Sequence, residues 1–258
     1  MLVIEALEKS YNKENKVLKG VSFDLAPKEI VGLIGASGAG KSTVGRILAN
    51  LEEGDAGSIL FEGQQLVKMS AKKRRLLSKD IQMIFQDPYS TLSPRMKIRE
   101  LIEEALIILR LEPDKNKRLD LVKEALELVS LDSKKYLERY PHELSGGERQ
   151  RVGIARAIVC NPKLIIADEP TSMLDTSLRL ELVALLKQLN EKRGTAFIFI
   201  THDIALTQNF CNRLIVLNEG VVVDAGRTRD VITHPTHEFT KKLIHALQTL
   251  EAREDINL

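Results

Sequence analysis

A glycine-rich segment between two apolar stretches constrains the fold of this chain more than any other feature. It reads Gly35-Ala36-Ser37-Gly38-Ala39-Gly40-Lys41-Ser42, which matches G-x-x-x-x-G-K-[ST] at every position. Residues 29–34 are typical of a buried strand and residues 41–51 of a helix. In that setting the loop amides and the helix N-terminus form a cradle for phosphate groups. A tight glycine turn without a ligand is the alternative.

The cradle predicts a bound nucleoside triphosphate. Lys41 would reach the β- and γ-phosphates as a point charge, and the Ser42 hydroxyl would hold Mg²⁺. The predicted nucleotide-binding residues are therefore those of the glycine segment, extended to Thr43 in the helix.

Two acids follow a short apolar strand later in the chain. Asp168 and Glu169 come after Leu164 to Ala167. Because a buried carboxylate without a partner is costly, an acid at this position is expected to have a function. We expect Asp168 to hold Mg²⁺, directly or through water, and Glu169 to polarise the attacking water as a general base. An ordinary acidic loop or helix cap is the alternative.

Composition favours a folded protein and narrows its partners. Hydrophobic residues make up 43% of the chain and charged residues 29%, and the net charge is +2. This balance lacks the basic excess typical of nucleic-acid binding, so no nucleic-acid partner is expected. Apolar runs such as residues 105–109 and 196–200 are far shorter than the roughly 20 residues of a spanning helix. The N-terminal residues also lack the pattern of a signal peptide.

The order of strand and helix patterns predicts a mixed architecture. Short apolar strands occupy residues 1 to about 65, helical periodicity covers about 94 to 160, and strands alternate with helices from 163 onward. Residues 214–217 and 221–224 flank Asn218-Glu219-Gly220, which indicates a hairpin. The sequence therefore predicts an α/β core with an antiparallel β piece at the front and a helical insert in the middle.

A further segment resembles a known family. Leu144-Ser145-Gly146-Gly147-Glu148-Arg149-Gln150 matches the signature sequence of ATP-binding cassette (ABC) ATPases. The resemblance covers nearly the whole chain and implies a P-loop NTPase fold. The implied fold is an ABC cassette with a RecA-like core, an N-terminal antiparallel β subdomain and an inserted helical subdomain. It implies one ABC ATPase domain over residues 1–258, with the core in 1–87 and 163–258 and the helical signature subdomain in about 88–162.

The resemblance also implies roles for single residues. Ser145, Gly146, Gly147 and Gln150 would contact ATP bound by a second cassette, so that two ATP molecules are sandwiched in a head-to-tail dimer. Asp175 would belong to a loop of the dimer interface, although Met173 stands where the family usually has Ala.

Three more positions match the family one by one. Tyr11 resembles the aromatic residue that stacks on adenine, with a surface tyrosine as the alternative. Gln86 resembles the glutamine that contacts Mg²⁺ and the water. His202 resembles the histidine that contacts the γ-phosphate, with a structural histidine as the alternative. The implied catalytic residues are Glu169, His202 and Gln86, and the implied Mg²⁺ ligands are Ser42, Gln86 and Asp168.

Three segments outside this set are similar to the peptide and nickel import subfamily. They are residues 85–95, 140–143 and 234–240. Many peptide importers carry a cysteine cluster in a C-terminal extension, and this chain has only two cysteines, Cys160 and Cys211. That departure favours a nickel-type importer, with peptides remaining open.

The implied function is the ATP-binding and hydrolysing subunit of a membrane importer for nickel, a metal chelate or peptides, with ATP and Mg²⁺ as cofactors. Its partners would be two membrane permease subunits, a second ABC ATPase subunit (the same chain or a paralogue) and, indirectly, a solute-binding protein. It would lie as a peripheral protein on the cytoplasmic face of the cell (inner) membrane. The alternatives are a soluble ABC ATPase acting on the ribosome or DNA, and the ATPase of an exporter.

Overall fold

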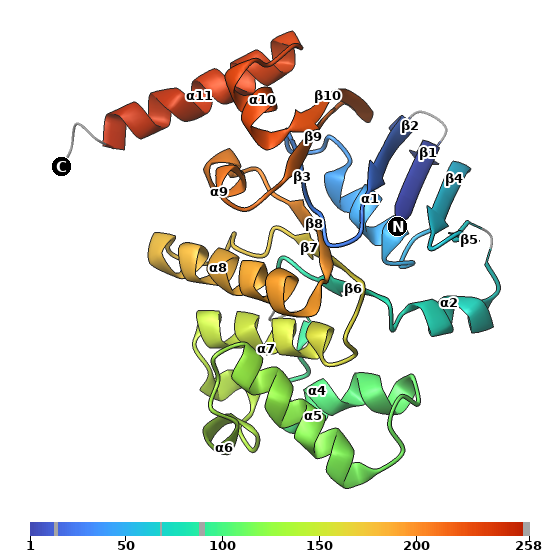
Figure 1. Ribbon diagram of the computed structural model, residues 1–258, viewed down its shortest axis with the longest axis vertical. Helices are drawn as coiled ribbons and strands as arrows, with labels where there is room; N and C mark the ends of the chain where they lie inside the picture. The colour runs from blue at the N-terminus through green and yellow to red at the C-terminus, as the bar shows by residue number, and fades with distance from the viewer. Residues whose placement is uncertain (13–14, 68, 88–90, 255–258) are drawn as a thin grey trace. The chain divides into compact units, whose positions relative to one another are not determined.

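The computed structural model describes residues 1–12, 15–67, 69–87 and 91–254 (Figure 1). The chain divides into two compact units. The first contains Met1–Met69 and Ile198–Leu258, and the second contains Ser70–Phe197.

An antiparallel sheet occupies the N-terminal part of the first unit. Its strands are β1 (Leu2–Ser10), β2 (Lys16–Leu25), β4 (Ala56–Phe61) and β5 (Gln64–Gln65), in the order β2-β1-β4-β5. Alternate residues of β2, among them Leu18, Val21 and Phe23, are buried. This period of two gives the sheet one apolar face. The antiparallel β piece predicted at the front of the chain is therefore present.

The second sheet of this unit carries the strand before the glycine segment. Within the first unit it contains β3 (Ile30–Gly35), most of β8 (Ala196–Ile200), β9 (Arg213–Asn218) and β10 (Val221–Arg227), in the order β10-β9-β3-β8. β3 runs parallel to β9 and every residue of β3 is buried. The predicted hairpin joins β9 to β10 through Glu219 and Gly220, whose positive φ angles are those of a type I′ turn.

Four helices complete the first unit: α1 (Lys41–Leu48), α9 (Ile204–Gln208), α10 (Thr228–Thr233) and α11 (Glu238–Glu254). The sequence predicts that α1 continues to residue 51, but it ends at Leu48. Asn50 adopts a left-handed φ of 64°, which stops the helix.

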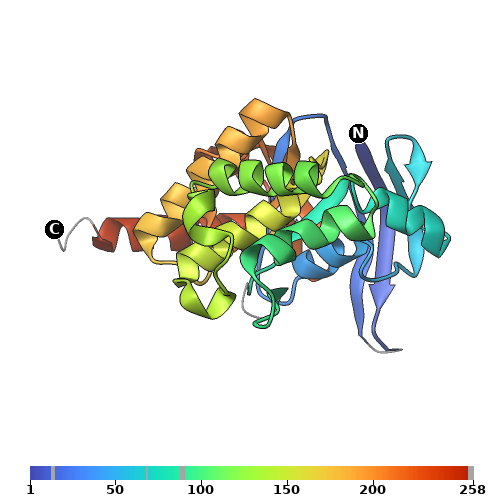
Figure 2. The same ribbon diagram turned by 90° about the horizontal axis from the view of Figure 1, so that it is seen from below.

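The second unit combines two parallel strands with a group of helices. β6 (Ile81–Ile84) pairs with β7 (Leu164–Asp168), and α2 (Ala71–Leu77) precedes β6. The helices α4 (Ile98–Ile108), α5 (Lys115–Leu128) and α7 (Gly146–Ile158) pack on one another, as both ribbon views show (Figures 1 and 2). The remaining elements are α6 (Ser133–Tyr136), the 3-10 helix η1 (Pro141–Glu143) and α8 (Thr176–Arg193).

The first helix of this group differs from its predicted position. Periodicity predicts residues 101–111, whereas α4 covers 98–108. The Glu100 carboxylate accepts a hydrogen bond from the Lys97 amide at 2.8 Å, which fixes the earlier start. In the part of the chain that the structure describes, no helix is both long and apolar enough to cross a membrane.

Two turns of the first unit allow a matched test of its packing. Glu62-Gly63 and Glu219-Gly220 are both type I′ turns, with glycine φ angles of 76° and 82°. A Cβ at Gly63 would meet nothing within 4 Å, whereas a Cβ at Gly220 would lie 2.2 Å from the carbonyl oxygen of Val17. Alanine at either position carries the cost of a left-handed backbone, about 1–2 kcal/mol.

We expect Gly220→Ala to lower the free energy of unfolding clearly more than Gly63→Ala does, because only Gly220 adds a clash with backbone. Urea unfolding of the two variants and the wild type measures the difference. Equal losses would show that the hairpin shifts without cost.

Candidate active site

The glycine segment forms a loop that leaves β3 at a crowded point. A Cβ at Gly35 would lie 2.0 Å from the carbonyl oxygen of Leu217, the β9 residue opposite it. Only glycine therefore lets the two strands pair at this position. The chain then passes through the exposed residues 36–38 to Gly40, the N-cap of α1.

Lys41 places a positive charge inside this loop. Its side chain is only 6% exposed, and its ammonium donates hydrogen bonds to the carbonyl oxygens of Gly35 at 2.8 Å and Ala36 at 2.9 Å. Ser42 and Thr43 follow in the first turn of α1. A held cation, an exposed loop backbone and a helix N-terminus fit a polyphosphate group.

Tyr11 lies close to the same helix. Its hydroxyl donates to Glu52 Oε2 at 2.7 Å and lies 3.4 Å from Thr43 Oγ1. The Lys9 ammonium is 5.7 Å from the centroid of the Tyr11 ring, and Tyr11 is 53% exposed. The structure therefore brings an accessible aromatic ring beside the glycine loop.

His202 follows β8 and is exposed. The Thr201 amide donates to the carbonyl oxygen of Leu33 in β3 at 3.3 Å. Asp203 caps α9 by accepting a hydrogen bond from the Leu206 amide at 3.4 Å. His202 thus stands between a strand end beside β3 and a capped helix, on the edge of the sheet where β3 runs into the glycine loop.

The second unit contains the acidic pair. Asp168 ends β7 and is 6% exposed, while Glu169 adopts a left-handed φ of 45°. The Gln86 amide donates to Glu169 Oε2 at 3.2 Å. Gln86 comes after β6, which pairs in parallel with β7, so both residues lie at the same end of neighbouring strands. Left-handed backbone in a residue other than glycine costs about 1–3 kcal/mol and is concentrated at functional sites.

The signature segment begins α7 with a capping box. The Ser145 hydroxyl accepts a hydrogen bond from the Glu148 amide at 3.3 Å, and Glu148 Oε2 accepts one from the Ser145 amide at 2.8 Å. The Tyr136 hydroxyl donates to the other oxygen of Glu148. This bond and that from Ser145 hold the pKa of Glu148 below its usual value.

Gln150 and Asp175 lie near the same helix start. Gln150 is 3% exposed, and its amide nitrogen has no hydrogen-bond partner in the described part of the chain. Asp175 caps α8 by accepting a hydrogen bond from the Leu178 amide at 3.0 Å. This bond and the one from the Ser177 hydroxyl lower the pKa of Asp175. A Cβ at Gly147 would lie 3.3 Å from the Leu178 side chain, so the starts of α7 and α8 are neighbours.

The predicted residues therefore form two sets. The first unit holds Tyr11, the glycine loop and His202, and the second holds Gln86, the signature residues, Asp168, Glu169 and Asp175. Sequence reasoning did not identify Tyr136 and Glu148 as part of the site. The S-x-x-E pattern of a capping box, Ser145 to Glu148, was the signal for the second of them.

The chain is similar to one family and to many known proteins, three of which are described here. Residues 18–172 match the family described as ABC transporter. The oligopeptide transport ATP-binding protein OppF of Streptococcus mutans is 42% identical over 232 residues, which are 90% of this chain and 75% of that protein. The ATP-binding cassette MJ0796, solved as a dimer in a post-hydrolysis state with ADP and Pi, is 31% identical with a TM-score of 0.80. That match covers 89% of this chain and 99% of the other.

CbiO1 from Clostridium perfringens, part of the ABC transporter complex CbiONQ, is 26% identical with a TM-score of 0.82 over 98% of each chain. These two structures confirm the predicted fold class, an α/β ABC cassette.

The Tyr136–Glu148 bond gives a prediction with a defined pH dependence. Tyr136→Phe should lower the free energy of unfolding by about 1 kcal/mol at pH 7. The pKa of Glu148 is lowered in the folded state. The stabilisation of the fold by the ionised Glu148 is therefore complete above the unfolded pKa of about 4.3, and it is lost as pH falls through the folded pKa. The loss should therefore shrink in acid.

Urea unfolding of the variant and the wild type between pH 7 and acid measures this effect. Tyr140→Phe is the control. It also removes a tyrosine hydroxyl, and it keeps the ring that stacks on His142, with 5.6 Å between the ring centroids. If the loss of unfolding free energy in Tyr136→Phe stays constant with pH, the contribution of Tyr136 does not depend on the ionisation of Glu148.

Proposed function

The chain belongs to the ABC transporter family of ATP-hydrolysing proteins, and we propose that it is the ATPase subunit of an importer for peptides. The observation that carries the proposal is the 42% identity with an oligopeptide transport ATP-binding protein over 90% of this chain. The relatives reported above give no specific support to nickel, which the sequence alone favoured. Peptides are therefore the substrate class proposed here.

We assign ATP binding to residues of the first unit. Lys41 neutralises charge on the β- and γ-phosphates, and the loop amides of Gly35 to Thr43 bind phosphate oxygens. Tyr11 stacks on the adenine. His202 donates a hydrogen bond to the γ-phosphate. The buried Lys41 ammonium and the exposed loop backbone beside it support this assignment.

Ser42, Gln86 and Asp168 would hold Mg²⁺. Hydroxyl, amide and carboxylate oxygens are the ligands that this hard cation prefers, and Asp168 is a buried carboxylate at a strand end. When bound, Mg²⁺ neutralises charge on the phosphate oxygens.

Glu169 is assigned as the general base. Its carboxylate accepts a proton from the attacking water as the water oxygen bonds to the γ-phosphorus, while the bond from that phosphorus to the β,γ-bridging oxygen breaks and ADP leaves. Gln86 and Ser172 restrain it: the Gln86 amide donates to one carboxylate oxygen, and the Ser172 hydroxyl donates to the Glu169 carbonyl oxygen at 3.0 Å. The residue is therefore held in its left-handed conformation at the end of β7.

A second cassette, either the same chain or a paralogue, would complete the reaction. Ser145, Gly146, Gly147 and Gln150 offer donors at the start of α7 to the γ-phosphate bound by that partner. Asp175 lies at the neighbouring start of α8 and would contact the partner across the interface. The unsatisfied amide nitrogen of Gln150 supports a role in binding.

The remaining partners would be two membrane permease subunits and, indirectly, a solute-binding protein. Residues 86–104 would form much of the permease contact, although residues 88–90 lie outside the described part of the chain. We place the protein on the cytoplasmic face of the cell (inner) membrane, with a catalytic core in residues 1–87 and 163–258 and a helical subdomain in about 88–162.

Uptake measurements test the substrate class. In cells that carry Lys41→Ala in place of the wild-type chain, uptake of a labelled oligopeptide should be lost while uptake of labelled nickel is unchanged. Loss of nickel uptake alone would overturn the peptide assignment and leave the ATPase assignment standing. Unchanged uptake of both would contradict a role in either importer.

Replacing the general base tests the mechanism. Glu169→Gln should lower kcat for ATP hydrolysis by about 100-fold or more, because general-base catalysis contributes at least that factor. The variant should still bind ATP and should accumulate as a dimer with it. Phosphate release and size-exclusion chromatography with ATP measure the two effects.

Glu191→Gln, an exposed position near the end of α8, is the matched control and should behave as the wild type. A Glu169→Gln protein that stays monomeric with ATP and hydrolyses it normally would contradict the role of Glu169.

A further inference from the structure

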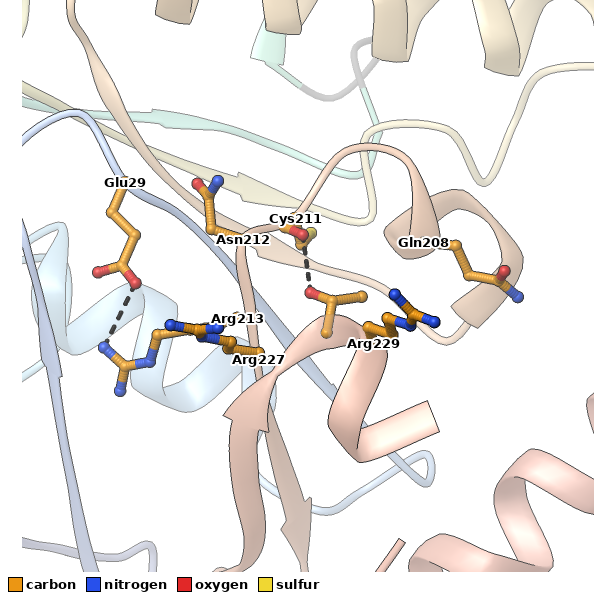
Figure 3. Close-up of a pocket in the computed structure, with 8 residues that line it drawn as sticks. Glu29, Gln208, Cys211, Asn212, Arg213, Arg227 and Arg229 are labelled. Atoms are coloured by element: carbon orange, nitrogen blue, oxygen red, sulfur yellow. Dashed lines mark hydrogen bonds and ion pairs between the residues drawn. The ribbon is translucent and has the colours of Figure 1, made fainter. Parts of the chain in front are cut away.

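A pocket lies in the first unit, away from the glycine loop. It has a volume of about 530 Å³, and its lining includes Glu29, Asn212, Arg213, Arg227, Thr228 and Arg229 (Figure 3). Glu29 precedes β3, whereas the glycine loop follows the last residue of that strand. The six residues of β3 separate the two places by roughly 20 Å.

Two arginines of the pocket face each other across a strand pair. Arg213 and Arg227 are direct partners in the antiparallel register of β9 and β10. Like charges at such positions destabilise a sheet, so this pairing is an electrostatic cost that the fold must offset.

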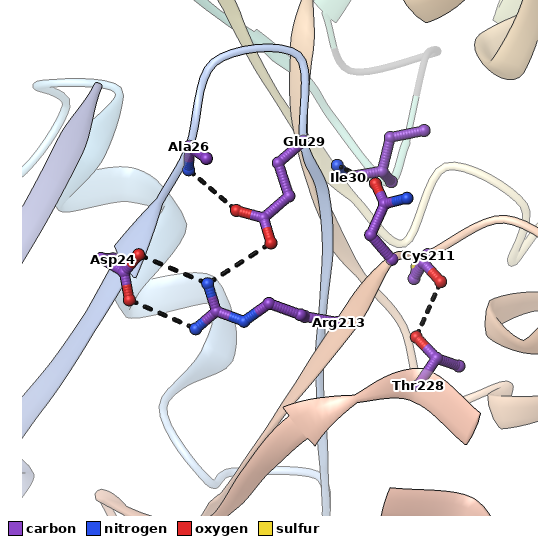
Figure 4. A network of polar contacts seen from close by, with 8 residues as sticks. Asp24, Ala26, Glu29, Ile30, Cys211, Arg213 and Thr228 are labelled. Atoms are coloured by element: carbon purple, nitrogen blue, oxygen red, sulfur yellow. Dashed lines mark hydrogen bonds and ion pairs between the residues drawn. The ribbon is translucent and has the colours of Figure 1, made fainter. Parts of the chain in front are cut away.

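Carboxylates balance the charge of Arg213 (Figure 4). The Arg213 guanidinium bonds to both oxygens of Asp24, at 3.2 and 3.3 Å, and to Glu29 Oε1 at 3.3 Å. Hydrogen bonding to Asp24 is the main cause that raises the pKa of Arg213. Glu29 is itself fixed, since its Oε2 accepts from the Ala26 amide at 2.8 Å. Arg213 is thus a rigid, neutralised wall of the pocket.

Arg227 and Arg229, unlike Arg213, are not paired with carboxylates in the described part of the chain. Both are exposed, and neither forms an ion pair within the described ranges of the chain. Thr228 between them is 5% exposed and anchored. Its amide donates to the Asn212 carbonyl oxygen at 3.1 Å and its hydroxyl to the Cys211 carbonyl oxygen at 2.7 Å. The backbone that carries both guanidiniums is therefore held in place before any ligand arrives, which lowers the entropy cost of binding.

We propose that this arginine pocket binds a small phosphomonoester, with Arg227 and Arg229 holding the phosphate group. A phosphomonoester concentrates nearly two negative charges on one group at neutral pH, and guanidinium geometry matches phosphate oxygens in pairs. The pocket volume lies in the range of small-molecule sites, so it has room for the rest of the molecule.

The test uses the full chain with its glycine loop saturated with ADP and Mg²⁺, so that phosphate binding there is blocked. Calorimetric titrations use inorganic phosphate, glycerol 3-phosphate and glucose 6-phosphate, with glucose as the neutral control. At least one phosphate compound should bind the wild type. Arg227→Ala/Arg229→Ala should bind it roughly tenfold more weakly or worse, because two charge-assisted contacts are lost.

Arg110→Ala, an exposed arginine of the second unit outside the proposed permease contact, is the matched control and should bind as the wild type. ADP affinity should be the same in all three proteins. Without ligand, the double variant should unfold at about the same temperature as the wild type, because both side chains are exposed and form no ion pair in the described part of the chain. Binding of glucose, equal binding by the double variant, or no binding of any phosphate compound or phosphate headgroup would overturn the proposal.

A lipid headgroup carries the same chemistry, and a second arm separates the sources. Sedimentation with phosphatidylcholine vesicles, with and without phosphatidic acid, shows whether a phosphate headgroup is bound. Binding that needs phosphatidic acid and both arginines, without binding of the soluble compounds, would identify the membrane as the source of the phosphomonoester. Vesicle binding that the double variant retains would count against the site.

Discussion

The parallel pairing of β3 with β9 is the interaction on which the first unit depends. At one end of the pair, Gly35 lies so close to Leu217 that no side chain fits between the strands, and the chain leaves the sheet as the loop that surrounds Lys41. At the other end, the Asn212 side chain accepts a hydrogen bond from the Ile30 amide at 2.8 Å, and Arg213 bonds to Glu29. One strand pair therefore positions both the phosphate loop and the arginine pocket.

Side-chain caps recur at the starts of helices in this structure. Ser145, Asp175 and Asp203 each accept a hydrogen bond from an amide in the first turn of the helix that follows. The cap satisfies a donor that would otherwise lack a partner, and it fixes the loop before the helix. Residues proposed to contact nucleotide lie within or beside these same turns. The groups proposed to recognise phosphate at the starts of α7 and α9 thus lie where these caps also stabilise the fold.

Prediction from sequence succeeded where the signal is local. Short apolar runs bounded by Gly, Asn and Pro identified the antiparallel strands, and continuous apolar runs identified β7 and β8. The segment Asn218-Glu219-Gly220 identified the hairpin from β9 to β10. It did less well at element ends, because Asn50 and Glu100 decide where α1 stops and α4 starts through single backbone conformations and hydrogen bonds. The helix α2 and the short strand β6 lacked a periodic pattern long enough to be recognised.

The sequence by itself determined the family and the candidate nucleotide residues, because each motif is a contiguous run whose chemistry depends on its own backbone. Tertiary structure alone decided which distant groups meet. Arg213 bonds to Glu29 across 184 positions of the chain, and Gln86 bonds to Glu169 across 83. Such pairs leave no local pattern, since their contact depends on strand order and register. The acidic pair could therefore be predicted from its motif, whereas the arginine pocket became visible only when β3, β9 and β10 were assembled into one sheet.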